Sequence, residues 1–158
     1  MPVSAIDSLL FKNLFGAEQI RAVFDDKAYI RRCVDVEAAL ALVQSRLGVI
    51  PKHAGQEIVT ACRDLDLDYD RLSNETEIVG YPILPLVRQL SAACGDDAGG
   101  YVHWGATTQD IQDTATVLQM KMGLQLVDDL LQSLISTLSA LVWKHKDTLQ
   151  AGRTHLQQ

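Results

Sequence analysis

The sequence has few of the features that mark nucleic-acid-binding, disulfide-bonded or secreted proteins. Lys and Arg together number 14 against 20 Asp and Glu, which gives a net charge of −6. This shortage of basic charge argues against a general nucleic-acid-binding protein, which normally presents a basic face. Small anionic ligands remain possible, because a few local Arg or His residues can outweigh the overall charge.

Cysteine is also scarce, and its pattern bears on the compartment. Cys33, Cys62 and Cys94 are odd in number, lie far apart and form no CxxC pair. This pattern favours reduced thiols in a cytosolic protein over a disulfide framework or a zinc site. The first residues lack a basic segment followed by a long apolar one, so no signal peptide is expected. No apolar run approaches the roughly 18 residues that suggest a membrane span, so we expect a cytoplasmic protein without membrane contact.

Helical periodicity is the dominant pattern, and it predicts an all-α fold. Apolar residues recur at steps of three and four, and the expected helices cover residues 18–24, 27–47, 51–63, 71–79 and about 82–93. Gly48 and Gly80 stand where glycines end helices, and Cys94–Gly100 is expected to be a loop. We expect an N-terminal helical domain over residues 1–100, followed by a loop and a long helix over residues 101–158.

The last predicted helix is far longer than the others. Apolar residues keep helical spacing from Ile111 to Leu141, so the helix is expected to cover about residues 109–150 and to stop at Gly152. About 40 residues at 1.5 Å each would span roughly 60 Å. Such a helix needs partners of similar length, as in a helical bundle or an oligomer.

The stretch Tyr101–Ala115 predicts the start of this helix. Gly105 is expected to open a turn, and Thr107 with Asp110 has the spacing of a capping box. A helix N-terminus offers unpaired backbone N–H groups and a partial positive charge, which suit a bound anion. With His103 and the adjacent hydroxyls of the TT pair, this end could bind a carboxylate. An ordinary helix cap after a loop is the alternative.

Two of the four histidines are candidates for chemistry. His53 and His145 are expected to be solvated surface residues, whereas His103 and His155 lie in glycine-bounded segments beyond helix ends. A histidine near neutral pH can donate or accept a proton. Arg153, close to His155, would add a guanidinium that pairs with carboxylates.

Geometry limits how these residues can combine. If the long helix is straight, its ends lie some tens of ångströms apart. His103 and His155 could then share a site only if different subunits contributed them or the chain folded back sharply. The same argument weighs against a metal site built from His103, Asp110, Asp113 and His155. A Ser/His/Asp elbow and a phosphate-binding glycine loop are both absent from the sequence.

Two segments resemble signatures of the fumarase/aspartase superfamily. The first is HWGATTQD at residues 103–110, continuing through DTA at 113–115, and the second is GRTHLQ at residues 152–157. YPILPLV at 81–87 and DVEAALA at 35–41 resemble the branch that contains the 3-carboxy-cis,cis-muconate cycloisomerases. The resemblance covers nearly the whole chain, with two motifs in register.

The resemblance implies homotetramers with a central helical bundle, in which three subunits build each active site. Enzymes of the superfamily add or eliminate a group next to a carboxylate, through a carbanion stabilised as an aci-carboxylate. In the muconate branch the added group is the substrate's own carboxylate, and the product is a γ-lactone of aromatic catabolism. No metal, organic cofactor or nucleic acid is implied.

The resemblance also assigns roles to residues. His155 is the candidate for proton transfer, and His103 would support it or contact the substrate. A tricarboxylate requires several preorganised donors; those implied here are Thr107, Thr108, Gln109, Arg153 and Thr154.

One departure and two alternatives accompany this hypothesis. Members of the superfamily are much longer, and the mobile serine loop that resembles their catalytic base would lie beyond residue 158. We therefore expect an N-terminal portion that is inactive alone. An adenylosuccinate lyase is the nearest alternative, although Phe11–Arg21 lacks an Arg-Tyr pair associated with that branch. A helical assembly module without catalysis is the other.

Overall fold

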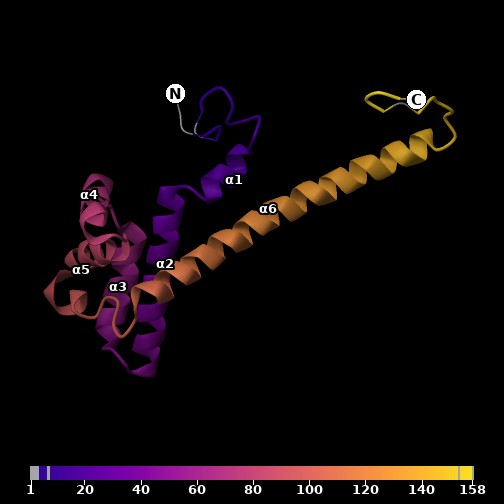
Figure 1. The fold of residues 1–158 in the computed structure, drawn as a ribbon. Coiled ribbons are helices and arrows are strands. Elements are labelled where there is room, and N and C mark those ends of the chain that lie inside the picture. Colours follow the sequence, from indigo (N-terminus) through magenta and orange to yellow (C-terminus); the bar gives the residue numbers. More distant parts are fainter. Residues whose placement is uncertain (1–3, 7, 153, 158) are drawn as a thin grey trace. The chain divides into compact units, whose positions relative to one another are not determined.

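The computed structural model of the chain describes residues 4–6, 8–152 and 154–157, and within these residues it contains helices and no strand (Figure 1). The prediction of an all-α fold is therefore confirmed. The chain divides into two compact units, Met1–Met122 and Gly123–Gln158. The helices are α1 (Glu18–Val23), α2 (Asp26–Leu47), α3 (Lys52–Asp64), α4 (Tyr69–Val79), α5 (Ile83–Gly99) and α6 (Thr108–His145).

Side-chain caps and glycines set the ends of α2 and α4. The carboxylates of Asp25 and Asp68 each accept a hydrogen bond from the backbone N–H three residues on, at 2.7 and 2.9 Å. Each satisfies one of the N–H groups that a helix leaves unpaired at its start. Gly48 and Gly80 close the same two helices in the left-handed conformation, with φ of 74° and 91°. Their predicted role as helix ends is confirmed.

The core of the first unit lies among α2, α3 and α5. Helix α2 packs against α3, and α3 packs against α5. The fully buried side chains include Val34 of α2, Ile58 of α3, and Leu86 and Leu90 of α5. Burying each such side chain contributes about 1.5–3 kcal/mol. The first turns of α6 join this core through Ile111 and Ala115, with 1% and 0% of their surface exposed, and so the start of α6 is anchored.

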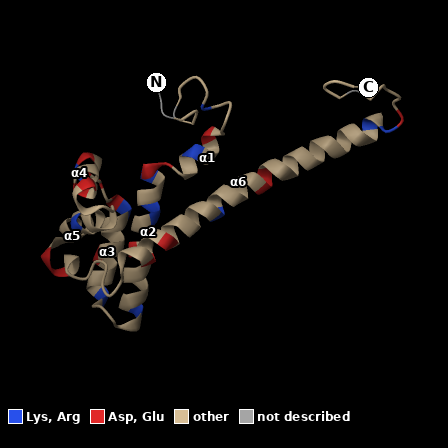
Figure 2. Cartoon of the chain, in the orientation of Figure 1, with Lys and Arg blue, Asp and Glu red and all other residues tan. Residues whose placement is uncertain are grey.

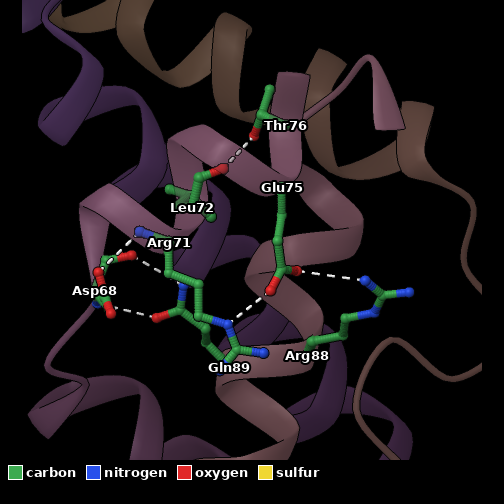
Figure 3. A network of polar contacts seen from close by, with 7 residues as sticks. All are labelled: Asp68, Arg71, Leu72, Glu75, Thr76, Arg88 and Gln89. Atoms are coloured by element: carbon green, nitrogen blue, oxygen red, sulfur yellow. Dashed lines mark hydrogen bonds and ion pairs between the residues drawn. The ribbon is translucent and has the colours of Figure 1, made fainter. Parts of the chain in front are cut away.

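Polar contacts fasten α4 to α5 (Figure 3). The Gln89 side chain accepts a hydrogen bond from Asp68 N–H at 3.0 Å and donates one to the Asp68 carbonyl at 3.1 Å. Glu75 pairs with Arg71 at 2.6 Å and with Arg88 at 3.3 Å. The arginines are exposed, and exposed ion pairs are weak. The two hydrogen bonds between Gln89 and the Asp68 backbone therefore fix the contact between α4 and α5 more firmly than the ion pairs do.

The expected loop at Cys94–Gly100 is instead the continuation of α5. The helix runs to Gly99 and is interrupted only at Gly95, whose φ of 77° and ψ of 176° are not helical. A Cβ added to Gly99 would lie 2.5 Å from the carbonyl oxygen of Ser91. The glycine is thus needed for close backbone packing, and Ala98 beside it is fully buried. Composition alone suggested a flexible loop where packing required a small residue.

Helix α6 starts one residue before the expected position and ends earlier than expected. It spans Thr108–His145, so the predicted end near Gln150 and the stop at Gly152 are wrong. Two basic residues, Lys144 and His145, occupy its last turn, where positive charge suits the helix dipole. A turn follows in which Thr148 N–H donates to the His145 carbonyl at 3.0 Å.

The second unit consists of the later turns of α6 and the segment after them. No charged residue occurs between Asp129 and Lys144, and Figure 2 shows this part of α6 without charge colours. Its large apolar side chains are exposed, from Leu124 and Val127 through Leu130, Leu131, Leu134, Ile135, Leu138, Leu141, Val142 and Trp143. By length and composition alone α6 could cross a membrane, since an 18-residue window has a mean hydropathy of 1.3. The expectation that no segment approaches this limit does not hold.

Candidate active site

The loop before α6 is fastened by one face of α2. The imidazole Nδ1 of His103 lies 2.6 Å from Glu37 Oε1. The Gln44 amide donates to the Trp104 carbonyl at 2.8 Å. Glu37 and Gln44 are seven residues apart, so they occupy the same side of α2. Two turns of one helix therefore hold both the side chain of His103 and the backbone that follows it.

The backbone of this loop is unusual at two positions. His103 has φ of 60°, the one positive value found at a described residue other than glycine. Such a conformation costs a side chain about 1–2 kcal/mol, and residues held this way are concentrated at functional sites. Gly105 follows with φ of 67°, which confirms the turn expected there. The Ala106 N–H donates to the His103 carbonyl at 3.3 Å and closes the turn.

Glu37 is a buried carboxyl group, and only one of its two oxygens has a hydrogen-bond partner among the described residues. One per cent of its side chain is exposed, and Oε2 has no hydrogen-bond partner among the described residues. Burial raises the pKa of Glu37 above its ordinary value, and the hydrogen bond with His103 acts in the opposite direction. A buried charge is costly unless it is paired, so the contact with His103 is central to this group.

In the sequence, Glu37 stood out only as part of the DVEAALA segment at residues 35–41, with no function of its own. A signal was nevertheless present, because glutamate is almost never fully buried unless it is paired. A carboxylate among Val34, Ala41 and other buried positions of α2 should have suggested a polar partner elsewhere in the chain. The sequence did not say which one, because His103 lies 66 residues away.

The start of α6 contains half of the predicted capping box. The Thr107 N–H donates to Asp110 Oδ2 at 2.9 Å, which confirms a helix start at this place. Asp110 thus supplies a carboxylate to the helix end itself. An added anion would rely on the Thr107 and Thr108 hydroxyls and on the N–H groups of the first turn. The amide of Gln109 is turned along the helix and donates to Asp113 Oδ2 at 3.2 Å.

One cavity of the first unit lies beside the loop that precedes α6, and a larger one lies elsewhere in the unit. One of about 440 Å³ lies between α2 and the start of α6, and its lining includes Val36, Leu40, Gly105 and Asp110. A larger one of about 720 Å³ lies among α3, α4 and α5. His103, Thr107 and Thr108 line neither of them. Thr107 is exposed, whereas His103 and Thr108 are partly buried.

The second signature lies in the second unit. His155 is exposed, and Thr154 closes a short turn in which its N–H and hydroxyl donate to the Gln157 carbonyl at 2.6 and 3.1 Å. Arg153 lies outside the described residues. His103 belongs to the first unit and His155 to the second, so the joint action of the two histidines stays a prediction.

The other two histidines and the three cysteines have the surroundings that the sequence predicted. His53 and His145 are exposed, as expected. Cys33, Cys62 and Cys94 are free thiols. Burial raises the pKa of Cys33 to about 11 and that of Cys62 to about 12. Within the described ranges, no three His, Cys, Asp or Glu side chains are grouped so as to hold a metal ion.

Comparison with known proteins gives the family. Residues 13–158 match the lyase family. The chain belongs to this family. A crystal structure of a fumarate lyase from Mesorhizobium sp. BNC1 is 53% identical, with a TM-score of 0.85 over 90% of this chain and 34% of that one. A β-carboxy-cis,cis-muconate cycloisomerase from Acinetobacter calcoaceticus sp. ADP1 is 37% identical, with a TM-score of 0.87 over 94% and 36% of the two chains.

A third relative widens the range of chemistry. Trans-aconitate decarboxylase 1 of Mycosarcoma maydis is 45% identical over 92% of this chain and 30% of its own length. The chain spans about a third of the length of these lyases. The expected superfamily and the all-α lyase fold are confirmed. Because these lyases carry different names and activities, membership of the family does not fix the substrate.

Proposed function

We propose that the full-length protein acts on an unsaturated tricarboxylate, with 3-carboxy-cis,cis-muconate as the first candidate and γ-carboxymuconolactone as its product. The observation that carries the proposal is the fastened His103 loop. It places a partly exposed imidazole, on a backbone with positive φ, just before a helix start that bears two adjacent hydroxyls. Hydroxyl and helix N–H groups are the donors that a polycarboxylate requires, and an imidazole beside them can take part in proton transfer.

The proposed reaction is an isomerisation in which no atom is lost. A carboxylate oxygen of the substrate forms a bond to an alkene carbon, and the π electrons move to the carbon beside another carboxylate. That carboxylate spreads the negative charge as an aci-carboxylate, and the carbanion carbon then takes a proton. His155 is the proposed proton-transfer residue, and His103 contacts substrate or supports the transfer. The proposed carboxylate contacts are Thr107, Thr108, Gln109, Arg153 and Thr154.

Decarboxylation of trans-aconitate is a second candidate, favoured by the 45% identity to the Mycosarcoma maydis enzyme. Trans-aconitate is also an unsaturated tricarboxylate, so the same donors would serve both substrates. An adenylosuccinate lyase relative from Methanocaldococcus jannaschii is 34% identical, which leaves that activity as a weaker alternative. A non-catalytic helical module remains the alternative of a different class.

The exposed apolar side chains of the second unit support an oligomer. A run of such residues without charge needs other helices around it, and a homotetramer with a shared bundle would supply them. Two adjacent aspartates, Asp128 and Asp129, lie within α6, and charged residues are costly in a bilayer. We therefore infer a bundle helix of a cytoplasmic enzyme rather than a membrane span.

The test is turnover by the full-length protein. Loss of muconate absorbance, with the lactone identified by NMR, is expected, while trans-aconitate and adenylosuccinate are assayed in parallel. His155→Asn should lower kcat by at least about 100-fold, and the 158-residue chain alone should be inactive. Turnover of trans-aconitate alone would replace the first candidate by the second. Activity unchanged in His155→Asn would refute the assigned role of that residue.

A further inference from the structure

Holding the loop before α6 in place does not require a charged contact between Glu37 and His103. Gln44 already holds the same loop through the Trp104 carbonyl at 2.8 Å, with a neutral amide. Glu37 does so with a carboxyl group of which 1% is exposed. A buried charged group is often no more stabilising than an apolar residue of similar size. Its presence at this position therefore calls for a role that an apolar residue of similar size could not fill.

The contact distinguishes the two nitrogens of the imidazole. Nδ1 lies 2.6 Å from the carboxylate, and this short distance is typical of a charge-assisted hydrogen bond. An ionised carboxylate can only accept, so it selects the imidazole form that carries a proton on Nδ1. Nε2 makes no hydrogen bond to the described part of the chain. With 19% of the His103 side chain exposed, Nε2 is the nitrogen left for a ligand.

We propose that Glu37 is a positioning residue that holds a proton on Nδ1 of His103 and leaves Nε2 as an unprotonated acceptor that faces the substrate and can take up a proton during the transfer. The part of this role that concerns substrate rests on the proposed function. The positive φ of His103 fits the same role, because a fixed backbone and a fixed ring nitrogen together define where Nε2 can bind. An acceptor fixed in this way can take up a proton without first reorienting the ring.

Two matched variants of the full-length protein separate positioning from fastening. Glu37→Met removes the carboxylate, whereas Gln44→Met removes the other fastener of the same loop from the same face of α2. Methionine preserves volume and is tolerated in irregular core positions. If Glu37 only fastens the loop, the two variants should behave alike. Circular dichroism and thermal unfolding check that both fold.

The first measurement is the ¹⁵N spectrum of the His103 ring at neutral pH, in protein labelled at histidine. Parent protein and Gln44→Met should show the proton on Nδ1. Glu37→Met should shift the ring toward the form protonated on Nε2. Glu37→Gln, whose amide oxygen can still accept, should restore the parent pattern. An unchanged ring in Glu37→Met would overturn the proposal.

The second measurement is turnover of the substrate. Glu37→Met should lower kcat/KM by about 100-fold, by analogy with other groups that orient a reactive imidazole. Gln44→Met should lower it less than about fivefold, and Glu37→Gln should recover most of kcat while KM stays raised. Equal losses of kcat/KM in the two methionine variants would mean that Glu37 only holds the loop in place. The ring spectrum needs no substrate, so a failed muconate assay would refute the proposed function and leave the positioning of His103 to be decided by the spectrum.

Discussion

The two units contain similar apolar residues but place them differently. In Met1–Met122, Leu86 and Leu90 are fully buried, whereas in Gly123–Gln158 about half of the surface of Leu134 and Leu138 is exposed. Both pairs follow helical spacing, so the pattern of residues does not explain the contrast. The first unit has α2, α3 and α5 to cover one another. The second has a single helix, and its stability must come from outside the unit.

The largest effect is expected from a charge in the second unit. Leu134→Asp would bury a carboxylate in the proposed bundle at a cost of several kcal/mol per subunit, so the oligomer should dissociate. Sedimentation of the full-length protein measures the mass. Gln132→Glu is the control, because residue 132 lies on roughly the opposite side of the helix. A Leu134→Asp protein with the mass of the parent would show that this surface is not an interface.

A smaller effect, confined to the first unit, is expected from Leu90→Ala. Its side chain is fully buried in α5, and the cavity left behind should lower the free energy of unfolding by about 2–5 kcal/mol. Urea unfolding followed by circular dichroism measures this change. Leu134→Ala should leave the unfolding transition of the first unit unchanged. It should affect only a transition whose midpoint depends on protein concentration. Equal losses in the same transition would mean that the two units do not unfold separately.

Most of the first unit could be predicted from the sequence, because its helices depend on local signals. Apolar periodicity and the glycines at 48 and 80 located the helices to within two or three residues. The error in α5 has a specific cause, since Gly99 packs against the Ser91 backbone, and a glycine used for close approach looks like one used for flexibility. The error at the end of α6 arose because the prediction extended the helix toward Gly152, whereas the apolar periodicity had already ended at Leu141, just before the last helical residue His145.

The candidate site was predictable only in part. The His103 loop was found because glycines and a capping box mark it within a few residues. Its partner Glu37 was missed, because a contact across 66 residues depends on how α2 packs, which periodicity does not specify. The pairing of His103 with His155 involves two separately described units. Family resemblance, rather than local physics, suggested that pairing.

Glu37→Gln should change how stability varies with pH in the first unit. The pKa of Glu37 is raised by burial above its ordinary value of 4.5, so the folded state holds this proton more tightly than the unfolded state. The resulting stabilisation is fully present below about pH 4 and is lost as pH rises through the folded-state pKa. The nearby thiols of Cys33 and Cys62, with pKa about 11 and about 12, stay neutral throughout.

The variant should therefore lose less stability than the parent between pH 4 and 8. Urea unfolding at pH 4, 6 and 8 measures the difference. Gln119→Met is the control, because it removes another buried hydrogen bond, from the Gln119 amide to the Val23 carbonyl, without removing a titratable group. Parallel curves for the parent and Glu37→Gln would mean that Glu37 does not titrate differently in the folded state.

The smallest expected effect compares one glycine from each unit. Gly105 has φ of 67° with open space around its Cα, so Gly105→Ala should lower the free energy of unfolding by about 1 kcal/mol through backbone strain alone. Gly152 also lies in open space but has no such φ, so Gly152→Ala should leave stability unchanged. Thermal unfolding of both variants measures the contrast. A neutral Gly105→Ala would imply that the His103 loop can relax, and the fixed backbone on which the positioning of that imidazole depends would then be lost.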